Sequence, residues 1–398
     1  MTHISQRVQS LTESATIAMT AKSRELKAQG LDIISLSIGE PDFNTPDHVK
    51  NAAKKAIDDN FSKYPPVAGY ADLQQAIANK FKRENNIEYA PNQIVVSTGA
   101  KQSIANVILS IIDPGDEVIL PAPYWVSYAD LVKLAGGVPV EVKAGVENDF
   151  KITAKQLSDA ITKKTRLIVY SSPCNPSGSV YSSAELEGLA KEVVKHEELY
   201  VLADEIYEYI NFTSERTASM ASFDFVKDRV VTVNGVAKGF AMTGWRIGYM
   251  GAPLWLAKAC DKLQGQITSG ANTIAQKATV AAVNEGINLT HEMKAAFLRR
   301  RDLVLGKLKE IPGLKTNVPQ GAFYIFPDVS YYLGKKFKDK VIKTGDDLAM
   351  FLLDEALVAC VGGDSFGSPE CIRISYATSD DVLVEAISRI KKALEKLS

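Results

Sequence analysis

The sequence predicts an α/β protein with a mostly parallel, seven-stranded central sheet, helices on both faces of that sheet, and a smaller α+β domain. Three observations lead to this fold. The 398-residue chain is longer than one compact core usually accommodates. Short apolar runs alternate with helical patterns through its middle, and such runs suit a sheet covered on both faces. From about residue 287 the pattern changes, which indicates a second domain.

Strands are predicted wherever a short, continuous apolar run occurs. In chain order these runs are 93–98, 116–122, 138–142, 165–172, 199–205, 230–236 and 246–252. Helices are predicted between them, for example over 101–112 and 184–198. Strands that alternate with helices are typical of a mostly parallel sheet.

The C-terminal part begins with a long charged helix predicted over 291–311. The run GAFYIFPDV, another helix, the run IRISYAT and a final helix follow it. We therefore expect a large domain over residues 46–286 and a small domain formed by residues 1–45 together with residues 287–398.

Composition excludes several classes of function. The net charge is −1, from 46 Lys and Arg against 47 Asp and Glu, which offers no attraction for nucleic acid or an acidic membrane surface. No export signal or membrane-spanning run is apparent, so a cytoplasmic location is expected. The four histidines lie in no motif, and the four cysteines are unpaired in pattern, so we expect free thiols and no metal site.

Unusual polar clusters occur where predicted strands end. They are 97-STGAKQS-103, 171-SSPCNPSG-178, 203-ADEIY-207 and 234-NGVAKG-239. In an open α/β sheet, ligands bind at the carboxyl ends of the strands. Clusters that are far apart in the sequence are therefore expected to meet at one site.

Two ionisable residues stand at the ends of apolar runs. Lys238 is either an ordinary surface lysine or an amine that forms a Schiff base, kept neutral by burial and by a nearby cation such as Arg246. Asp204 is either a helix cap or salt-bridge partner, or the counter-ion of the protonated pyridine nitrogen of pyridoxal phosphate (PLP). Tyr207 stands three residues on, where its hydroxyl could reach a ring oxygen.

Three further features are compatible with the same cofactor. The loop at Gly99 and Ala100 places free backbone N–H groups at a predicted helix start, which suits a phosphate or carboxylate. Pro-x-Asn-Pro-x-Gly is first a turn, but a rigid turn would also fix the amide of Asn175. Arg373 alternates with two isoleucines, so it is either a solvated edge residue or a fork for a substrate carboxylate.

With these parts in view, the chain resembles the fold-type I, PLP-dependent aminotransferases of class I, and is most similar to subgroup Ib bacterial aspartate aminotransferases. The resemblance runs nearly end to end. The motifs that carry it include LSIGEPDF, KYPPVAGYADLQQAI, STGAKQSI, SSPCNPSG, ADEIYEY, NGVAKGFAMTGWRIGY, PQGAFYIF and IRISYAT. Among these, NGVAKGFAMTGWRIG is highly specific.

The resemblance implies a role for each matching residue. Lys238, Asp204 and Tyr207 would be catalytic: Lys238 binds PLP covalently and moves the substrate proton, Asp204 keeps the ring nitrogen protonated, and Tyr207 binds the ring oxygen with Asn175. The cofactor would also be contacted by Gly99, Ala100, Lys101, Trp125, Arg246 and, across a homodimer interface, Tyr64. The substrate would be bound by Gly39, Lys101, Trp125, Asn175, Arg373, Ser14 and Thr16, with Lys101 meeting a distal carboxylate.

Two positions depart from the pattern of this family. Ala237 replaces a serine whose hydroxyl contacts the phosphate, and such a hydrogen bond is worth roughly 1.5–3 kcal/mol. Weaker PLP retention is therefore expected unless Ser103 or Thr268 compensates. Gly362 replaces a proline, which is expected to loosen that segment.

The resemblance implies amino transfer from L-aspartate to 2-oxoglutarate by a ping-pong mechanism. Prephenate, aromatic amino acids and alanine remain open as substrates, and so does a PLP β-lyase reaction on the same core. A non-enzymatic regulator with a PLP fold would be expected to carry a basic DNA-binding extension, and no such segment is apparent.

Overall fold

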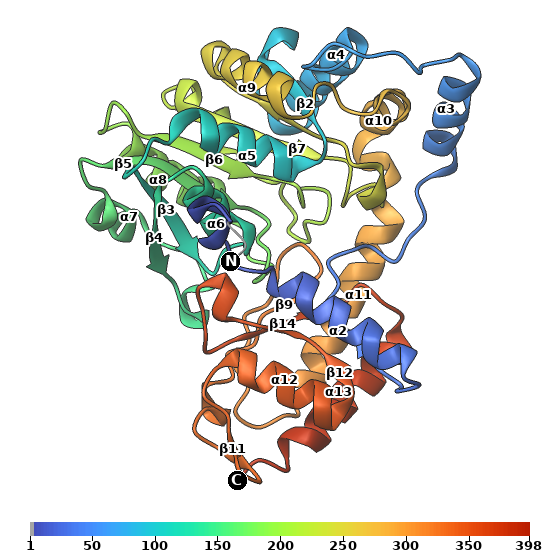
Figure 1. The fold of residues 1–398 in the computed structure, drawn as a ribbon, viewed down its shortest axis with the longest axis vertical. Coiled ribbons are helices and arrows are strands. Elements are labelled where there is room, and N and C mark those ends of the chain that lie inside the picture. The colour runs from blue at the N-terminus through green and yellow to red at the C-terminus, as the bar shows by residue number, and fades with distance from the viewer. Residues whose placement is uncertain (1–3) are drawn as a thin grey trace.

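The computed structural model describes residues 4–398 and places a seven-stranded sheet at the centre of its larger part (Figure 1). From one edge to the other the strands are β2 (Ile94–Ser97), β8 (Gly248–Gly251), β7 (Val230–Gly235), β6 (Tyr200–Asp204), β5 (Thr165–Ser171), β3 (Glu117–Ala122) and β4 (Val138–Lys143). Only β8 runs antiparallel to its neighbours within this sheet. The predicted mostly parallel, seven-stranded sheet is confirmed.

Both faces of the sheet are buried under helices. Along β5, Ile168 belongs to one apolar core while Leu167 and Val169 belong to the core on the other face. The helices that contribute to the first core are α3 (Asp47–Asp58), α4 (Ala71–Lys80), α7 (Ala154–Ala160), α8 (Ser183–Val193) and α10 (Thr273–Glu285). Those that contribute to the second are α5 (Ala100–Ile111), α6 (Ser127–Leu134) and α9 (Leu254–Ile267). α7 (Ala154–Ala160) contacts α8. Two-sided burial explains why the strands read as continuous apolar runs.

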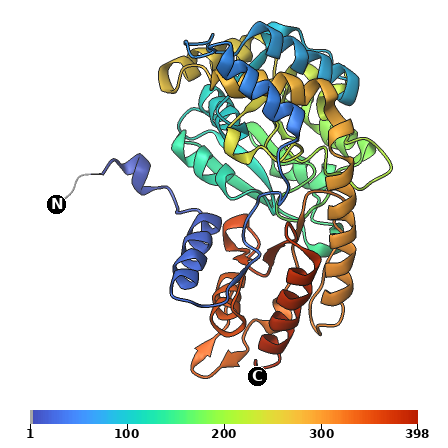
Figure 2. The ribbon, with the colours of Figure 1, turned by 90° about the vertical axis from the view of Figure 1, so that its right-hand side faces the viewer.

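The C-terminal part lies in the lower half of Figure 1 and is a smaller α+β arrangement. Helix α11 (His291–Leu308) descends into it from the part that contains the large sheet, as Figure 2 shows from the side. Its three-stranded antiparallel sheet has the order β13 (Val361–Gly362), β14 (Ile372–Ser375) and β9 (Tyr324–Ile325). Helices α12 (Gly345–Ala356) and α13 (Asp380–Leu394) and the β10–β11 hairpin (Lys336–Phe337, Lys340–Val341) complete it.

The N-terminal segment contacts this smaller part. Strand β1 (Ile34–Ser35) pairs in parallel with β12 (Val358–Ala359). Helix α2 (Ala15–Ala28) contributes Met19 to a small apolar cluster with Leu353 of α12, whereas the short helix α1 (Gln6–Gln9) contacts α6. The domain boundaries at residues 46 and 287 stay a prediction.

One predicted strand begins later than expected, with a consequence for the site. The run 246–252 becomes a strand only from Gly248. Residues Thr243–Trp245 form a 3₁₀ turn and Arg246 takes a left-handed backbone conformation with φ 57°, which a strand cannot include. Arg246 therefore belongs to the loop that precedes β8. None of the helices within residues 4–398 is long and apolar enough to cross a membrane.

Strands β2, β5, β6 and β7 all run in the same direction, because β8 is antiparallel to both β2 and β7. Their carboxyl ends therefore lie at one edge of the sheet. The four polar clusters of the sequence follow these four strands, and they meet in a single pocket.

Candidate active site

The pocket at this edge has a volume of about 260 Å³. All the site residues predicted from the sequence line it except Gly99 and Tyr64. Those that line it are Ser14, Thr16, Gly39, Ala100, Lys101, Trp125, Asn175, Asp204, Tyr207, Lys238, Arg246 and Arg373. The structure therefore brings together residues from both ends of the chain and from four strand ends.

Lys238 follows β7 and is partly buried in the pocket. Its Nζ donates one hydrogen bond, to the backbone oxygen of Gly39 at 2.5 Å, and no carboxylate of residues 4–398 forms a salt bridge with it. Burial and, after it, the positive charge of Arg373 lower the pKa of Lys238 to about 8, while the carboxylates of Glu40 and Asp204 oppose the change. Arg246 lowers this pKa as the sequence predicts, and Arg373, which the sequence did not place beside Lys238, has the larger influence.

Asp204 is the last residue of β6 and is almost completely buried. Its Oδ2 accepts a hydrogen bond from the hydroxyl of Tyr128 at 2.6 Å, and its Oδ1 accepts one from the backbone N–H of Ile206 at 3.2 Å. No helix begins at Asp204 and it has no ion-pair partner among residues 4–398, so neither structural alternative applies. Burial raises the pKa of Asp204 to about 6, while the two hydrogen bonds and Lys238 oppose that rise.

Arg373 is fully buried, on the middle strand of the small sheet, which excludes the alternative of a solvated edge position. Its Nη1 donates to Oδ1 of Asn175 at 2.9 Å and its Nη2 to the backbone oxygen of Ser37 at 2.7 Å. Its Nε has no partner, and no carboxylate of the described chain pairs with the guanidinium. A buried charge without a counter-ion is costly, so a charged ligand is needed to compensate it.

The start of α5 forms an anion-binding corner. Gly99 precedes the helix with φ 85°, and a Cβ at this position would lie only 2.3 Å from Nη2 of Arg246. Glycine is therefore needed here, both for the backbone conformation and for the close approach of the guanidinium. The helix N-terminus and the guanidinium together suit a phosphate group.

The two compensating residues suggested for Ala237 differ in availability. The Thr268 hydroxyl accepts a hydrogen bond from Gln102 and donates one to the backbone oxygen of Ser269. The Ser103 hydroxyl is buried, lies in the first turn of α5 and has no partner. Of the two, only the Ser103 hydroxyl is therefore uncommitted.

Gly362 is tightly packed. It pairs with Ile372 in the small sheet, and a Cβ at this position would lie 1.8 Å from Oδ1 of Asp346. The Asp346 side chain fills the space where a proline ring would begin, which gives a physical reason for glycine at this position. Whether the segment is loosened stays a prediction.

Lys101 and Tyr64 lie at the periphery. The Lys101 ammonium lies 4.8 Å from the centre of the Trp125 ring, and burial together with Arg246 lowers its pKa. Tyr64 is almost wholly exposed, at 96%, and does not line the pocket of its own chain. Its contribution across a homodimer interface stays a prediction.

Sequence reasoning missed two tyrosines at this site. Tyr128 lies on the first turn of α6, where its hydroxyl reaches Asp204, and nothing in the residue pattern indicates this contact. Tyr324 lines the pocket from β9, and its hydroxyl lies 2.9 Å from that of Tyr207. In the run GAFYIF it looks like an ordinary strand residue.

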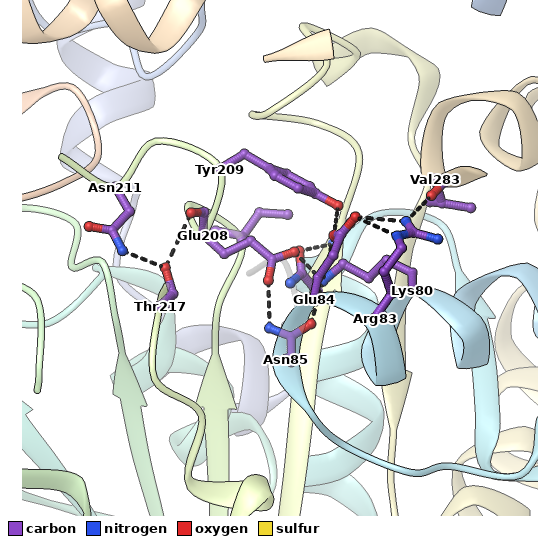
Figure 3. A network of polar contacts seen from close by, with 12 residues as sticks. Lys80, Arg83, Glu84, Asn85, Glu208, Tyr209, Asn211, Thr217 and Val283 are labelled. Atoms are coloured by element: carbon purple, nitrogen blue, oxygen red, sulfur yellow. Dashed lines mark hydrogen bonds and ion pairs between the residues drawn. The ribbon is translucent and has the colours of Figure 1, made fainter. Parts of the chain in front are cut away.

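The segment that follows β6 also carries charge on its other side. Figure 3 shows Glu208 pointing toward Lys80 and Asn85, and Glu208 does not line the pocket. Lys80 Nζ donates to Glu208 Oε1 and, at 2.8 Å, to Asn85 Oδ1, while Asn85 Nδ2 donates to Glu208 Oε2 at 2.7 Å. Lys80 is fully buried, so this closed triad is a structural ion pair.

Comparisons with known proteins agree with this architecture. The family model described as "Aminotransferase class I and II" matches residues 31–390. The chain is 46% identical to an aspartate aminotransferase of Bacillus subtilis, over 99% of this chain and all of that protein. It is 44% identical, over the whole of both chains, to an aspartate/prephenate aminotransferase of Cereibacter sphaeroides. A crystal structure of the aspartate aminotransferase from Rhizobium meliloti superposes with a TM-score of 0.96 at 42% identity, covering both chains completely.

Proposed function

The chain belongs to the class I and II aminotransferase family and is an aminotransferase, and we propose that it uses PLP to transfer the amino group of L-aspartate to 2-oxoglutarate. One observation carries the proposal. Two cations, Lys238 and Arg373, line the pocket, and neither forms an ion pair with a carboxylate of residues 4–398. Asp204 lies buried in the same pocket. This arrangement suits a cofactor with a basic nitrogen and a substrate with a carboxylate.

The residues present fit PLP at each of its polar groups. Asp204 would pair with the ring nitrogen, and Tyr207 with Asn175 would bind the ring oxygen. The phosphate would lie at the start of α5 against Arg246, with the free hydroxyl of Ser103 in the same turn. When bound, PLP supplies an electron sink that makes the α-proton of a joined amino acid acidic.

Lys238 would then carry out the proton transfer. With a pKa of about 8, a useful fraction of its amine is neutral near neutral pH and can attack a carbonyl carbon. The Nζ of Lys238, as a neutral amine, would take the α-proton of the bound amino acid and deliver a proton again to complete the amino transfer. Asp204, as a buried carboxylate, would hold the ring nitrogen in its protonated form.

The substrate end is assigned by charge. Arg373, oriented by Asn175 and Ser37, would bind the α-carboxylate. Lys101, beside Ser14 and Thr16 in the lining, would bind the second carboxylate of aspartate. Prephenate is the strongest alternative, because the Cereibacter relative carries it in its name. Aromatic amino acids, alanine and a β-lyase reaction remain alternatives from the family resemblance.

We also propose a ping-pong order and a cytoplasmic homodimer in which Tyr64 reaches the phosphate across the interface. The exposure of Tyr64 supports this arrangement, because a tyrosine left 96% exposed in one chain is free to be covered by another.

A spectrum and a substrate panel test these proposals. The purified protein should have a visible absorption band from lysine-bound PLP, and Lys238→Ala should abolish it. A band unchanged in that variant would overturn the assignment of Lys238. A kcat/KM panel of aspartate, glutamate, phenylalanine, alanine and cystathionine as donors, with 2-oxoglutarate, and of prephenate as acceptor, would then decide the substrate.

A further inference from the structure

Tyr324 lines the pocket, although the sequence analysis assigned it no role. It belongs to β9 of the small sheet and is completely buried. Its hydroxyl lies 2.9 Å from the hydroxyl of Tyr207, and the two rings meet edge to face with centroids 5.8 Å apart. Tyr207 comes from the segment after β6, so the hydroxyl pair joins the two parts of the molecule.

The hydroxyl pair imposes a direction on its hydrogen bond. Each tyrosine hydroxyl has one proton to donate, and either oxygen can accept. A Tyr207 hydroxyl that donated to Tyr324 would have no proton left for a ligand in the pocket. A Tyr207 hydroxyl that donates into the pocket requires Tyr324 to donate to Tyr207.

Tyr324 also contacts the other ligand-binding groups. Its ring centre lies 4.5 Å from the Arg373 guanidinium carbon. A Cβ on Gly39 would lie 2.5 Å from the Tyr324 hydroxyl, so glycine is what lets this backbone pass so close. The oxygen of the same Gly39 accepts the hydrogen bond of Lys238. The Arg373 guanidinium and the Gly39 backbone therefore hold Tyr324 on two sides, which leaves its hydroxyl little freedom to turn away from Tyr207.

We propose that Tyr324 is a positioning residue that donates to the Tyr207 hydroxyl and so directs the Tyr207 proton toward the ring oxygen of the cofactor. The inference rests on the proposed function, because it needs PLP in the pocket. A hydroxyl that accepts one hydrogen bond donates a stronger one, since the two bonds polarise each other. Tyr324 thus acts on the cofactor through Tyr207.

The variant Tyr324→Phe removes only the hydroxyl and keeps the ring against Arg373. The readout is the pH at which the visible band of bound PLP changes, which reports loss of the proton near the ring oxygen. A hydrogen bond donated to that oxygen favours its deprotonated form. Weakening the Tyr207 donation should therefore move the midpoint upward, by about half a pH unit.

Tyr376→Phe is the matched control. Tyr376 is equally buried and donates its hydroxyl to the backbone oxygen of Ala322 at 3.2 Å, but it does not line the pocket. Its midpoint should equal that of the wild type. Tyr207→Phe should move the midpoint further than Tyr324→Phe, and the double variant should match Tyr207→Phe alone, because Tyr324 acts only through Tyr207.

A Tyr324→Phe midpoint equal to that of the wild type would overturn the inference, and so would a double variant whose shift is the sum of the two single shifts. Both outcomes leave the proposed function intact, because the wild type still shows the band. A wild-type protein without any visible band on addition of PLP would overturn the proposed function itself. Thermal unfolding of the three single variants verifies that each is folded before titration.

Discussion

Two lysines lie on opposite sides of the segment that follows β6, and their surroundings differ in one respect. Lys80 Nζ is held by the carboxylate of Glu208 and the amide of Asn85. Among residues 4–398, Lys238 Nζ hydrogen-bonds only to the backbone oxygen of Gly39. Burial lowers the pKa of Lys238, and Arg373 and Arg246 add to this effect. Removing one partner of a paired buried lysine destabilises the fold, whereas an unpaired buried lysine is kept close to neutrality and can react.

The same contrast holds for the acids of this segment. Asp204 points into the pocket, where burial raises its pKa to about 6. Glu208 does not line the pocket, and each of its oxygens is engaged by Lys80 or Asn85 (Figure 3). We infer that the buried charges of Lys238 and Asp204 lower the free energy of unfolding, whereas the contacts of Glu208 with Lys80 and Asn85 maintain it. Four changes break or sharpen this comparison.

The largest expected effect is on catalysis. Lys238→Ala should lower kcat by about 10³-fold or more, because the amine that moves the proton is lost. The free energy of unfolding of the cofactor-free protein should not fall, because Lys238 has no carboxylate partner to lose. Steady-state rates and urea titrations measure the two quantities, with Lys238→Arg as the control that keeps the charge. A large loss of stability in Lys238→Ala would contradict the comparison.

The next effect is on stability from the far side. Lys80→Met should lower the free energy of unfolding by about 3 kcal/mol, because Glu208 is left buried and unpaired. The double variant Lys80→Met with Glu208→Leu should recover at least half of the loss. Urea titration of both is compared with Lys191→Met, which breaks an exposed pair with Glu187 and should cost well under about 1 kcal/mol. Equal losses for Lys80 and Lys191 would show that the triad is not structural.

A smaller effect is the pH dependence that Asp204 gives to the free energy of unfolding. The pKa of Asp204 is raised from 3.8 to about 6 in the folded chain, so its contribution to stability is fully present below pH 3.8 and is lost as the pH rises through about 6. Asp204→Asn should therefore raise the stability of the cofactor-free protein at pH 8 by about 2 kcal/mol and have little effect at pH 4. Urea titrations at the two pH values measure this, and an equal change at both would reject the assigned pKa shift.

The smallest effect concerns the rim of the pocket. Lys101→Ala should lower kcat/KM for aspartate about 10-fold, because one charge-assisted hydrogen bond to the second carboxylate is lost. Alanine, which lacks that carboxylate, is the internal control and should change less than about two-fold. Equal losses of kcat/KM for both donors would mean that Lys101 supports the structure of the pocket and does not bind the second carboxylate of the substrate.

The residues of the pocket were predictable from the sequence, and those of the Lys80 triad were not. Lys238, Asp204 and Arg373 each interrupt an apolar run, and a charge in such a place stands out. Lys80 and Asn85 lie among charged residues at the end of α4. They converge because the helix widens into a π-turn over Phe81–Asn85, a local geometry that the residue pattern does not indicate.

The positions of the strands were predictable from the sequence, but the direction of β8 was not. Apolar runs give the position of each buried strand, but the direction of β8 depends on how the loop before it folds. Tyr324 escaped prediction because a tyrosine in an apolar strand is ordinary until its hydroxyl is seen beside that of Tyr207. The pKa of Lys238 likewise depends on Arg373, 135 positions later in the numbering, whose proximity only the packed fold reveals.

The connection between β7 and β8 has one more consequence. Lys238 and Arg246 both belong to this single loop, so local chain geometry sets the distance between them. Arg373 belongs to the small sheet and approaches Lys238 from the other part of the molecule. Any displacement of one part against the other would change the proton affinity of Lys238 while leaving its spacing to Arg246 fixed. The pKa of Lys238 therefore depends on how closely the small sheet approaches the large one. A titration midpoint of Lys238 that is unchanged in Arg373→Leu would rule this out.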